Sequence, residues 1–98
     1  MIKIKVESND DRITKIVISG HALYDDYGKD IVCASVSSIV ITTVNAILRA
    51  DVNSISYDED PFVIRILKNS YITNLLIDNM ISLLKELERD YPKNVRFL

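Results

Sequence analysis

Apolar and polar positions alternate in two runs near the start of the chain. Charged residues separate the apolar ones within 2–7, and this two-residue period is typical of a strand with one solvent-facing side. The segment 13–18 is apolar and mostly β-branched, and the polar cluster 9–11 lies between the two runs. The pattern therefore predicts a hairpin of two strands, and we expect Gly20 to end the second.

Two longer segments show the 3.6-residue period of an amphipathic helix. The first covers 31–50 and the second covers about 71–90. The first is rich in β-branched residues, but a twenty-residue strand would be abnormally long, so we predict a helix. Asp30 is its expected N-cap, because a carboxylate there can accept bonds from the first free amides. Pro92 follows the second helix at a position typical of a helix end.

Three short apolar segments complete the predicted fold. Strands are expected at 54–57 and 62–67, joined by the acidic turn 58–61, and a short last strand is expected at 95–97. The element order is then ββαββαβ. We predict an α+β fold, with two helices on one face of a mostly antiparallel sheet, in a single domain over residues 1–98.

Composition and charge narrow the function classes. The 98 residues carry a net charge of −2, and tight sequence-independent binding to nucleic acid requires a basic surface, so we expect no direct nucleic-acid partner. The first residues alternate and lack the apolar core of a secretory signal, and uninterrupted apolar runs are short, so we expect no membrane partner. One cysteine and one histidine exclude a four-ligand Cys/His zinc site, and no cofactor or metal is expected. A lone thiol without an export signal favours the cytoplasm.

The single histidine and the single cysteine bracket the loop 20–30, which contains both glycines of the chain. His21 follows the second strand, and Cys33 lies in the first turn of the first predicted helix. A helix N-terminus favours the thiolate form of a cysteine, and a nearby imidazole can take its proton and later return it to a leaving amine. Free amides of the same helix could stabilise an oxyanion. Gly20 and Gly28 are the expected hinges of the loop.

A structural interpretation of the same residues stays open on spacing alone. A free cysteine is among the most buried residue types, so Cys33 could be a core residue and His21 an unrelated surface residue. Asp30 could be a cap and nothing more. Ser37 lies one helical turn after Cys33 and could line the same site, although most helical serines have no such role.

The residue string from 20 to 37 is more informative than the spacing. It reads GHA, then five residues, then GKDIVCASVS. It resembles the signature of the ribosomal-processing cysteine protease family Prp, which reads G-H-A, a short variable loop and G-x-D-[IVL]-V-C-A-[AG]-x-S. The resemblance covers essentially the whole chain through its length and element order. Ser35 departs from the usual Ala or Gly, which puts the fine shape of the pocket in question.

The resemblance implies a cytoplasmic bacterial cysteine endopeptidase without a cofactor. Its substrate would be the N-terminal extension of a large-subunit ribosomal protein (the L27-type protein), and it would form a homodimer. Cys33 would be the nucleophile and His21 the general base, with Asp30 as a supporting residue and Ser37 as a pocket residue. Two alternatives remain: a non-catalytic peptide-binding module in ribosome assembly, and a redox sensor built on a low-pKa cysteine.

Overall fold

A computed structural model describes residues 1–20 and 31–98, and these contain two helices and five strands in the predicted order. The elements are β1 (Ile2–Asn9), β2 (Arg12–Ser19), α1 (Ile31–Ala50), β3 (Ile55–Asp58), β4 (Phe62–Ile66), α2 (Tyr71–Asp90) and β5 (Val95–Phe97). The order ββαββαβ and the α+β class are therefore confirmed. Both helices have the twenty-residue length that their periodicity predicts.

The five strands form one sheet in the spatial order β3-β4-β2-β1-β5. Three of the four pairings are antiparallel, and only β1 and β5 run parallel. In the β2–β4 pair, Ile18 lies opposite Phe62. The end of β2 therefore lies beside the start of β4, and this pairing brings the β3–β4 turn close to Gly20.

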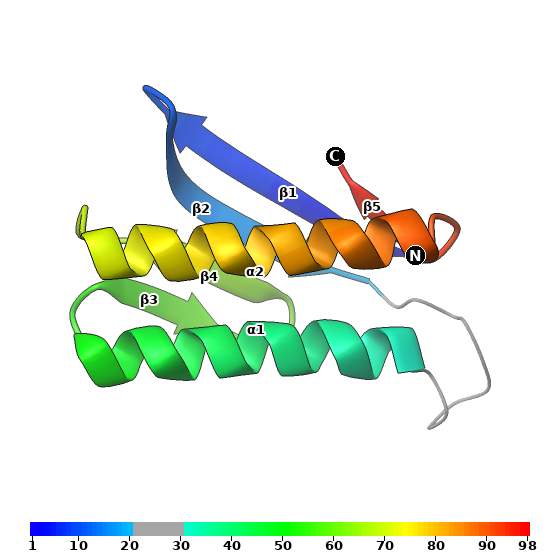
Figure 1. Ribbon diagram of the computed structural model, residues 1–98, viewed down its shortest axis with the longest axis horizontal. Coiled ribbons are helices and arrows are strands. Elements are labelled where there is room, and N and C mark those ends of the chain that lie inside the picture. The colour runs from blue at the N-terminus through cyan, green and yellow to red at the C-terminus, as the bar shows by residue number, and fades with distance from the viewer. Residues whose placement is uncertain (21–30) are drawn as a thin grey trace.

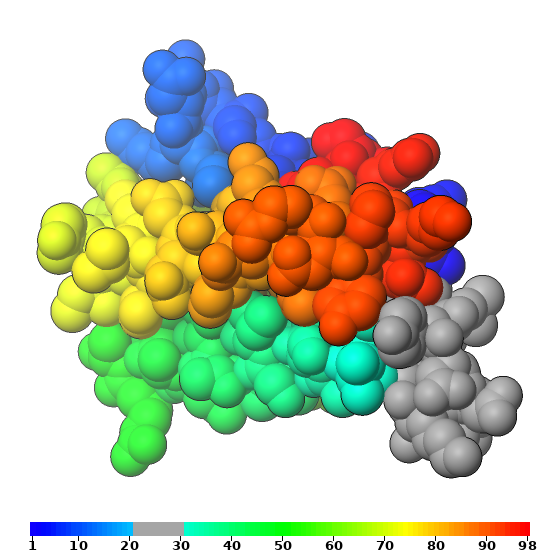
Figure 2. Space-filling model, turned by 45° about the vertical axis from the view of Figure 1, so that its right-hand side comes forward, coloured from blue at the N-terminus to red at the C-terminus, as the bar shows by residue number. Residues whose placement is uncertain are grey.

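Both helices cover the same face of the sheet and run antiparallel to each other (Figure 1). The space-filling view shows them side by side along the molecule (Figure 2). Alternate residues of the strands point toward the helices, as the two-residue period requires. Burying these apolar side chains is the main favourable contribution to folding. The core consists of Ile2, Ile4, Ile16, Ile18, Val32, Val36, Val40, Val44, Ile47, Ile55, Ile64, Ile77, Met80, Leu84 and Val95.

The ends of the helices are held by local interactions. Ser70 caps α2, and its hydroxyl oxygen accepts a hydrogen bond from the amide of Thr73 at 3.1 Å. Asp30, the predicted cap of α1, lies outside the described residues. Gly20 ends β2 as predicted and has a φ of +89°.

Helix α1 is unusually apolar for a helix of this length. Within the described part of the chain, it is the one helix that is long and apolar enough to cross a membrane, with a mean hydropathy of 2.1. Length and hydropathy are weak evidence for a membrane-spanning helix, because the core helix of a globular protein meets the same criterion. Here α1 packs against α2 and supplies six of its residues to the buried interior.

Candidate active site

Cys33 is the third residue of α1, and its side chain is half-buried. At this position it lies in the first helical turn, where backbone amides have no partner within the helix and the helix dipole is positive. Both effects favour a negatively charged sulfur over a neutral one. The sequence-based placement of Cys33 at the helix start is therefore the placement that the structure shows.

The Cys33 side chain lines a groove of about 530 Å³ between the start of α1 and the sheet. Ser37, one turn further along α1, lines the same groove, so the structure brings these two predicted residues together. The remaining walls come from β1, the end of β2 with Gly20, the β3–β4 turn and the first residue of β4. The lining residues are Ile2, Ile18, Ser19, Gly20, Cys33, Val36, Ser37, Glu59, Asp60, Pro61 and Phe62.

The groove combines an apolar floor with an acidic wall. Ile2, Ile18 and Val36 are buried core residues whose surfaces reach the groove. Glu59 and Asp60 are exposed, and they are the charged side chains among the described lining residues. An extended peptide segment with an apolar side chain next to a basic one would complement this surface.

A residue of β3, Tyr57, contacts the acidic wall through Glu59. The Tyr57 hydroxyl donates a hydrogen bond to Glu59 Oε1 at 3.4 Å, and the Tyr57 ring stacks on Phe62 with 6.0 Å between centroids. Partial burial raises the pKa of the Tyr57 phenol, and the negative charge of Glu59 raises it further. The phenol therefore stays protonated and available as a donor across the neutral range.

Gly20 lies at the edge of the groove and cannot be replaced without strain. Its φ of +89° is in the region that L-residues with a side chain rarely adopt. A Cβ atom there would overlap with the backbone carbonyl oxygen of Met1. Glycine is thus required by both backbone conformation and close approach. A hinge role for Gly20 remains a prediction.

Three predicted site residues, His21, Asp30 and Gly28, lie outside the described residues. Their assigned roles therefore stay predictions. Gly20, the residue immediately before His21 in the chain, is described and lines the groove that contains Cys33.

Sequence reasoning treated segment 58–61 only as a turn and missed its place in the site. Glu59, Asp60 and Pro61 reach the groove because β4 pairs with β2 and not with β1. Strand neighbours of this kind are not encoded in periodicity. The local signal that could have drawn attention to the turn is its unusual concentration of three carboxylates beside a proline.

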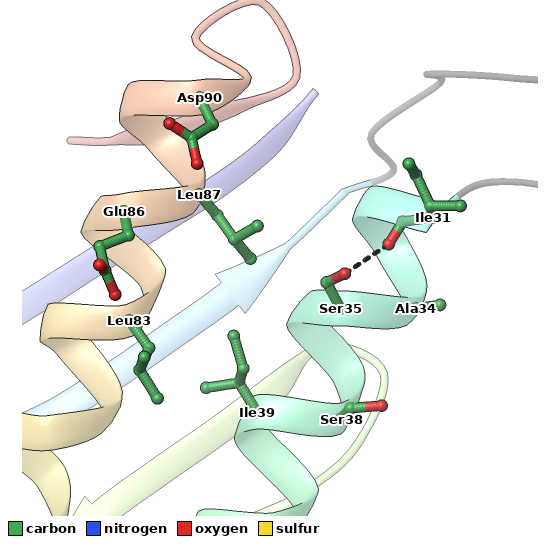
Figure 3. A pocket seen from close by; sticks show the side chains of 9 residues that line it. All are labelled: Ile31, Ala34, Ser35, Ser38, Ile39, Leu83, Glu86, Leu87 and Asp90. Atoms are coloured by element: carbon green, nitrogen blue, oxygen red, sulfur yellow. Dashed lines mark hydrogen bonds between the residues drawn. The ribbon is translucent and has the colours of Figure 1, made fainter.

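A second groove of about 710 Å³ runs between α1 and α2 (Figure 3). Figure 3 shows Ser35 on the α1 side of this groove and Leu83, Glu86 and Leu87 on the α2 side. The Ser35 hydroxyl donates to the carbonyl oxygen of Ile31 at 2.7 Å. Ser35 is the one departure from the family signature, and it lines this groove and not the groove of Cys33. The Ser35 side chain therefore forms no part of the described walls around the thiol.

Within residues 1–20 and 31–98, no three histidine, cysteine or carboxylate side chains come together in a way that could hold a metal ion. The chemistry available in the described part of the site is therefore that of a thiol, two hydroxyls and two carboxylates.

Comparison with known proteins gives a consistent result. The family model for cysteine protease Prp matches residues 1–96. The ribosomal processing cysteine protease Prp of Staphylococcus aureus is 34% identical, with 98% of this chain and 96% of the relative covered. The Bacillus subtilis protein of the same name is 32% identical, with 91% and 88% covered.

A solved structure extends the similarity to the fold. The crystal structure of the essential ribosomal processing protease Prp from S. aureus, in complex with a covalently linked product peptide, matches with a TM-score of 0.89 and 33% identity. The match covers 99% of this chain and 97% of that one. A sequence match over nearly the whole chain, a matching fold and a thiol at a helix start in a groove agree with one another: the chain belongs to the cysteine protease Prp family and is a cysteine-type peptidase.

Proposed function

We propose that residues 1–98 act as one cysteine-endopeptidase domain that removes the N-terminal extension of a large-subunit ribosomal protein (the L27-type protein). The observation that carries the proposal is the position of Cys33, which is half-buried at the start of α1 and lines a groove of about 530 Å³. The Prp structures from S. aureus, one with a substrate peptide and one with a covalently linked product peptide, support the same reading.

The proposed reaction uses Cys33 as the nucleophile and His21 as the general base. His21 takes the thiol proton, and the sulfur attacks the scissile carbonyl carbon to form a tetrahedral intermediate. The amides of the first turn of α1 supply hydrogen-bond donors for the oxyanion. The protonated imidazole then gives its proton to the leaving amine, and water hydrolyses the thioester to release the second product and restore the thiol.

The continuity of the chain at Gly20 supports the pairing of His21 with Cys33. Gly20 lines the groove of Cys33 and is bonded directly to His21. Asp30 is proposed as a supporting residue, and Ser37, which shares the groove with Cys33, is proposed as a pocket residue.

The acidic wall of the groove favours a substrate segment that carries positive charge. Glu59 and Asp60 would face a substrate segment that carries lysine or arginine, and proteins that bind ribosomal RNA are rich in such residues. We propose that the protein works in the cytoplasm, where ribosomal proteins are made, and that it acts as a homodimer.

The test is incubation of the protein with candidate ribosomal proteins that keep their native N-termini, followed by intact-mass measurement. We expect the wild type to release one N-terminal peptide and Cys33→Ala to release none. Ser35→Ala is the matched control, because Ser35 lies two residues further along α1 but lines the other groove. Cleavage by Cys33→Ala at the wild-type rate would refute the proposal.

The same samples distinguish the protease from the alternative hypothesis, a non-catalytic peptide-binding module. A module would bind the extension without cutting it, and its thiol would react with iodoacetamide only at alkaline pH. A protease thiol is expected to react well below pH 8, because the reactive species is the thiolate.

A further inference from the structure

The sheet face that the helices leave uncovered carries a concentration of positive charge. Strand registers place its outward side chains, because residues directly opposite one another point to the same face. Six of them are cationic and two are acidic. The cationic residues are Lys3, Lys5, Arg12, Lys15, Arg65 and Arg96, and the acidic residues are Glu7 and Asp58. This face therefore has a formal charge of +4 in a chain whose total charge is −2.

Arg12 lies at the hairpin end of this face, opposite Asn9, and the other charges divide into two zones. On β2 and β4, Lys15 lies opposite Arg65, and each has a carboxylate partner. Lys15 Nζ is 3.8 Å from Glu7 Oε2, and Arg65 is 3.7 Å from an oxygen of Asp58. The like-charge repulsion between opposite strands is thus offset in this zone.

The second zone lies on β1 and β5 and has no such compensation. Lys3 is the register partner of Arg96, and Lys5 follows on the same face of β1, about 6.7 Å further along the strand. All three side chains are exposed, and none forms an ion pair with another described residue. We call Lys3, Lys5 and Arg96 the cationic strip.

We propose that the cationic strip is a docking surface for the phosphate backbone of RNA. Charge complementarity carries the proposal: three clustered cations, none of them ion-paired with a carboxylate of residues 1–20 or 31–98, match a dense row of phosphates, and Lys and Arg are the residues that bind phosphate. The outward positions of all five strands include no aromatic side chain. Contact with the backbone and not stacking of bases is therefore the expected mode, without sequence preference.

Two other polyanions fit the surface less well. Binding to an anionic membrane usually adds exposed apolar side chains that insert into the lipid, but the apolar residues on this face, Val17 opposite Lys5 and Val63 opposite Val17, are both half-buried. The choice of RNA over an acidic protein rests on the proposed function, because a substrate from the large ribosomal subunit is found next to RNA. The net charge of −2 predicts no nucleic-acid partner. That total, however, sums the charges of all faces of the molecule, and the fold concentrates positive charge on this one.

The proposal is tested by fluorescence anisotropy with a labelled single-stranded RNA of mixed sequence and about twenty nucleotides, with no peptide substrate present. If three phosphates are neutralised, affinity should fall about 20-fold between 50 and 200 mM salt. In Lys3→Gln/Lys5→Gln/Arg96→Gln, affinity at 50 mM should fall at least 10-fold, and the salt dependence should nearly vanish.

A matched control removes the same charge elsewhere. Arg49→Gln/Lys68→Gln/Arg89→Gln also loses three exposed cations, none of them on this face, and should bind RNA within about 3-fold of the wild type. Glu7→Gln should strengthen binding a few-fold, because it frees Lys15 from its carboxylate partner. Equal loss in the strip variant and the control would overturn the proposal.

Two competitors and one activity measurement complete the test. Tighter binding of polyglutamate, or of phosphatidylglycerol vesicles, than of RNA at equal charge would also overturn the proposal. Cleavage of a free peptide by the strip variant should match the wild type, because none of the three residues lines the groove of Cys33. Absence of cleavage in the wild type would reject the proposed function and leave the RNA result to be judged by itself.

Discussion

The two grooves beside the first turns of α1 differ in chemistry more than in size. The groove between α1 and α2 is the larger, at about 710 Å³ against about 530 Å³, yet its described lining offers serine hydroxyls and carboxylates but no thiol. The smaller groove contains Cys33 together with an apolar floor and an acidic wall. Neighbouring residues of one helix thus reach two different surfaces, and the placement of a reactive atom identifies the site better than volume does.

The largest expected difference between the two grooves is catalytic. His21→Ala should lower kcat/KM for peptide cleavage by about 10²- to 10⁴-fold, because the thiol loses its general base. Glu86→Gln, on the wall of the α1–α2 groove, should leave kcat/KM within about 2-fold of the wild type, because exposed charges contribute little. Steady-state kinetics on a quenched fluorescent peptide measures both. Full activity in His21→Ala would remove the dyad from the mechanism.

The next effect concerns the backbone at the edge of the Cys33 groove. Gly20→Ala should lower the free energy of unfolding by about 1–3 kcal/mol, because it combines an unfavourable φ with an overlap against Met1. Ser35→Ala, in the other groove, should change it by less than about 0.5 kcal/mol, because Ser35 only bonds its own helix. Urea denaturation followed by circular dichroism tests the difference. Equal stability of the two variants would show that Gly20 is not constrained.

A smaller effect is expected at the acidic wall. Glu59→Gln/Asp60→Asn should reduce kcat/KM for a lysine-containing peptide about 3- to 10-fold, since exposed charge pairs contribute up to about 1 kcal/mol each. Cleavage of a peptide in which alanine replaces lysine should change little. The same pair of changes at Glu86 and Asp90 is the control in the α1–α2 groove. Equal losses on both peptides would mean that the wall does not select basic residues.

The smallest effect depends on pH. The folded-state pKa of Tyr57 is raised above its usual value of 10.0, so its contribution to stability is complete below pH 10 and is lost as pH rises through the folded-state pKa. Tyr57→Phe should therefore flatten the loss of thermal stability between pH 9 and 11, with little change at pH 7. A melting-temperature series across this range checks the slope. An unchanged slope in Tyr57→Phe would assign the loss to other groups.

Much of the fold could be predicted from the sequence because its signals are local. The two-residue period of 2–7 and the 3.6-residue period of 71–90 each define one element without reference to any other. Sheet order is a different kind of information. Nothing local shows that β4 pairs with β2 or that β5 runs parallel to β1, because these contacts join segments far apart in the chain.

The residues of the candidate site also fall into two groups: those that local sequence signals place, and those that long-range strand pairing places. Cys33 could be placed at a helix start from its position in the sequence, and Ser37 one turn later from the helical period. Glu59 and Asp60 could not be placed in the groove, because only the long-range pairing of β2 with β4 brings them there. The cationic strip was hidden for a related reason: it depends on the pairing of the chain's first strand with its last.

The close approach of Met1 to Gly20 has a practical consequence for recombinant work. An affinity tag fused ahead of Met1 would begin at the rim of the Cys33 groove, and we expect it to hinder substrate access. A tag after Leu98 avoids this, because that residue is 72% exposed and follows β5, which β1 separates from β2. Assays on N-terminally fused protein should therefore be repeated after the fusion has been cut away.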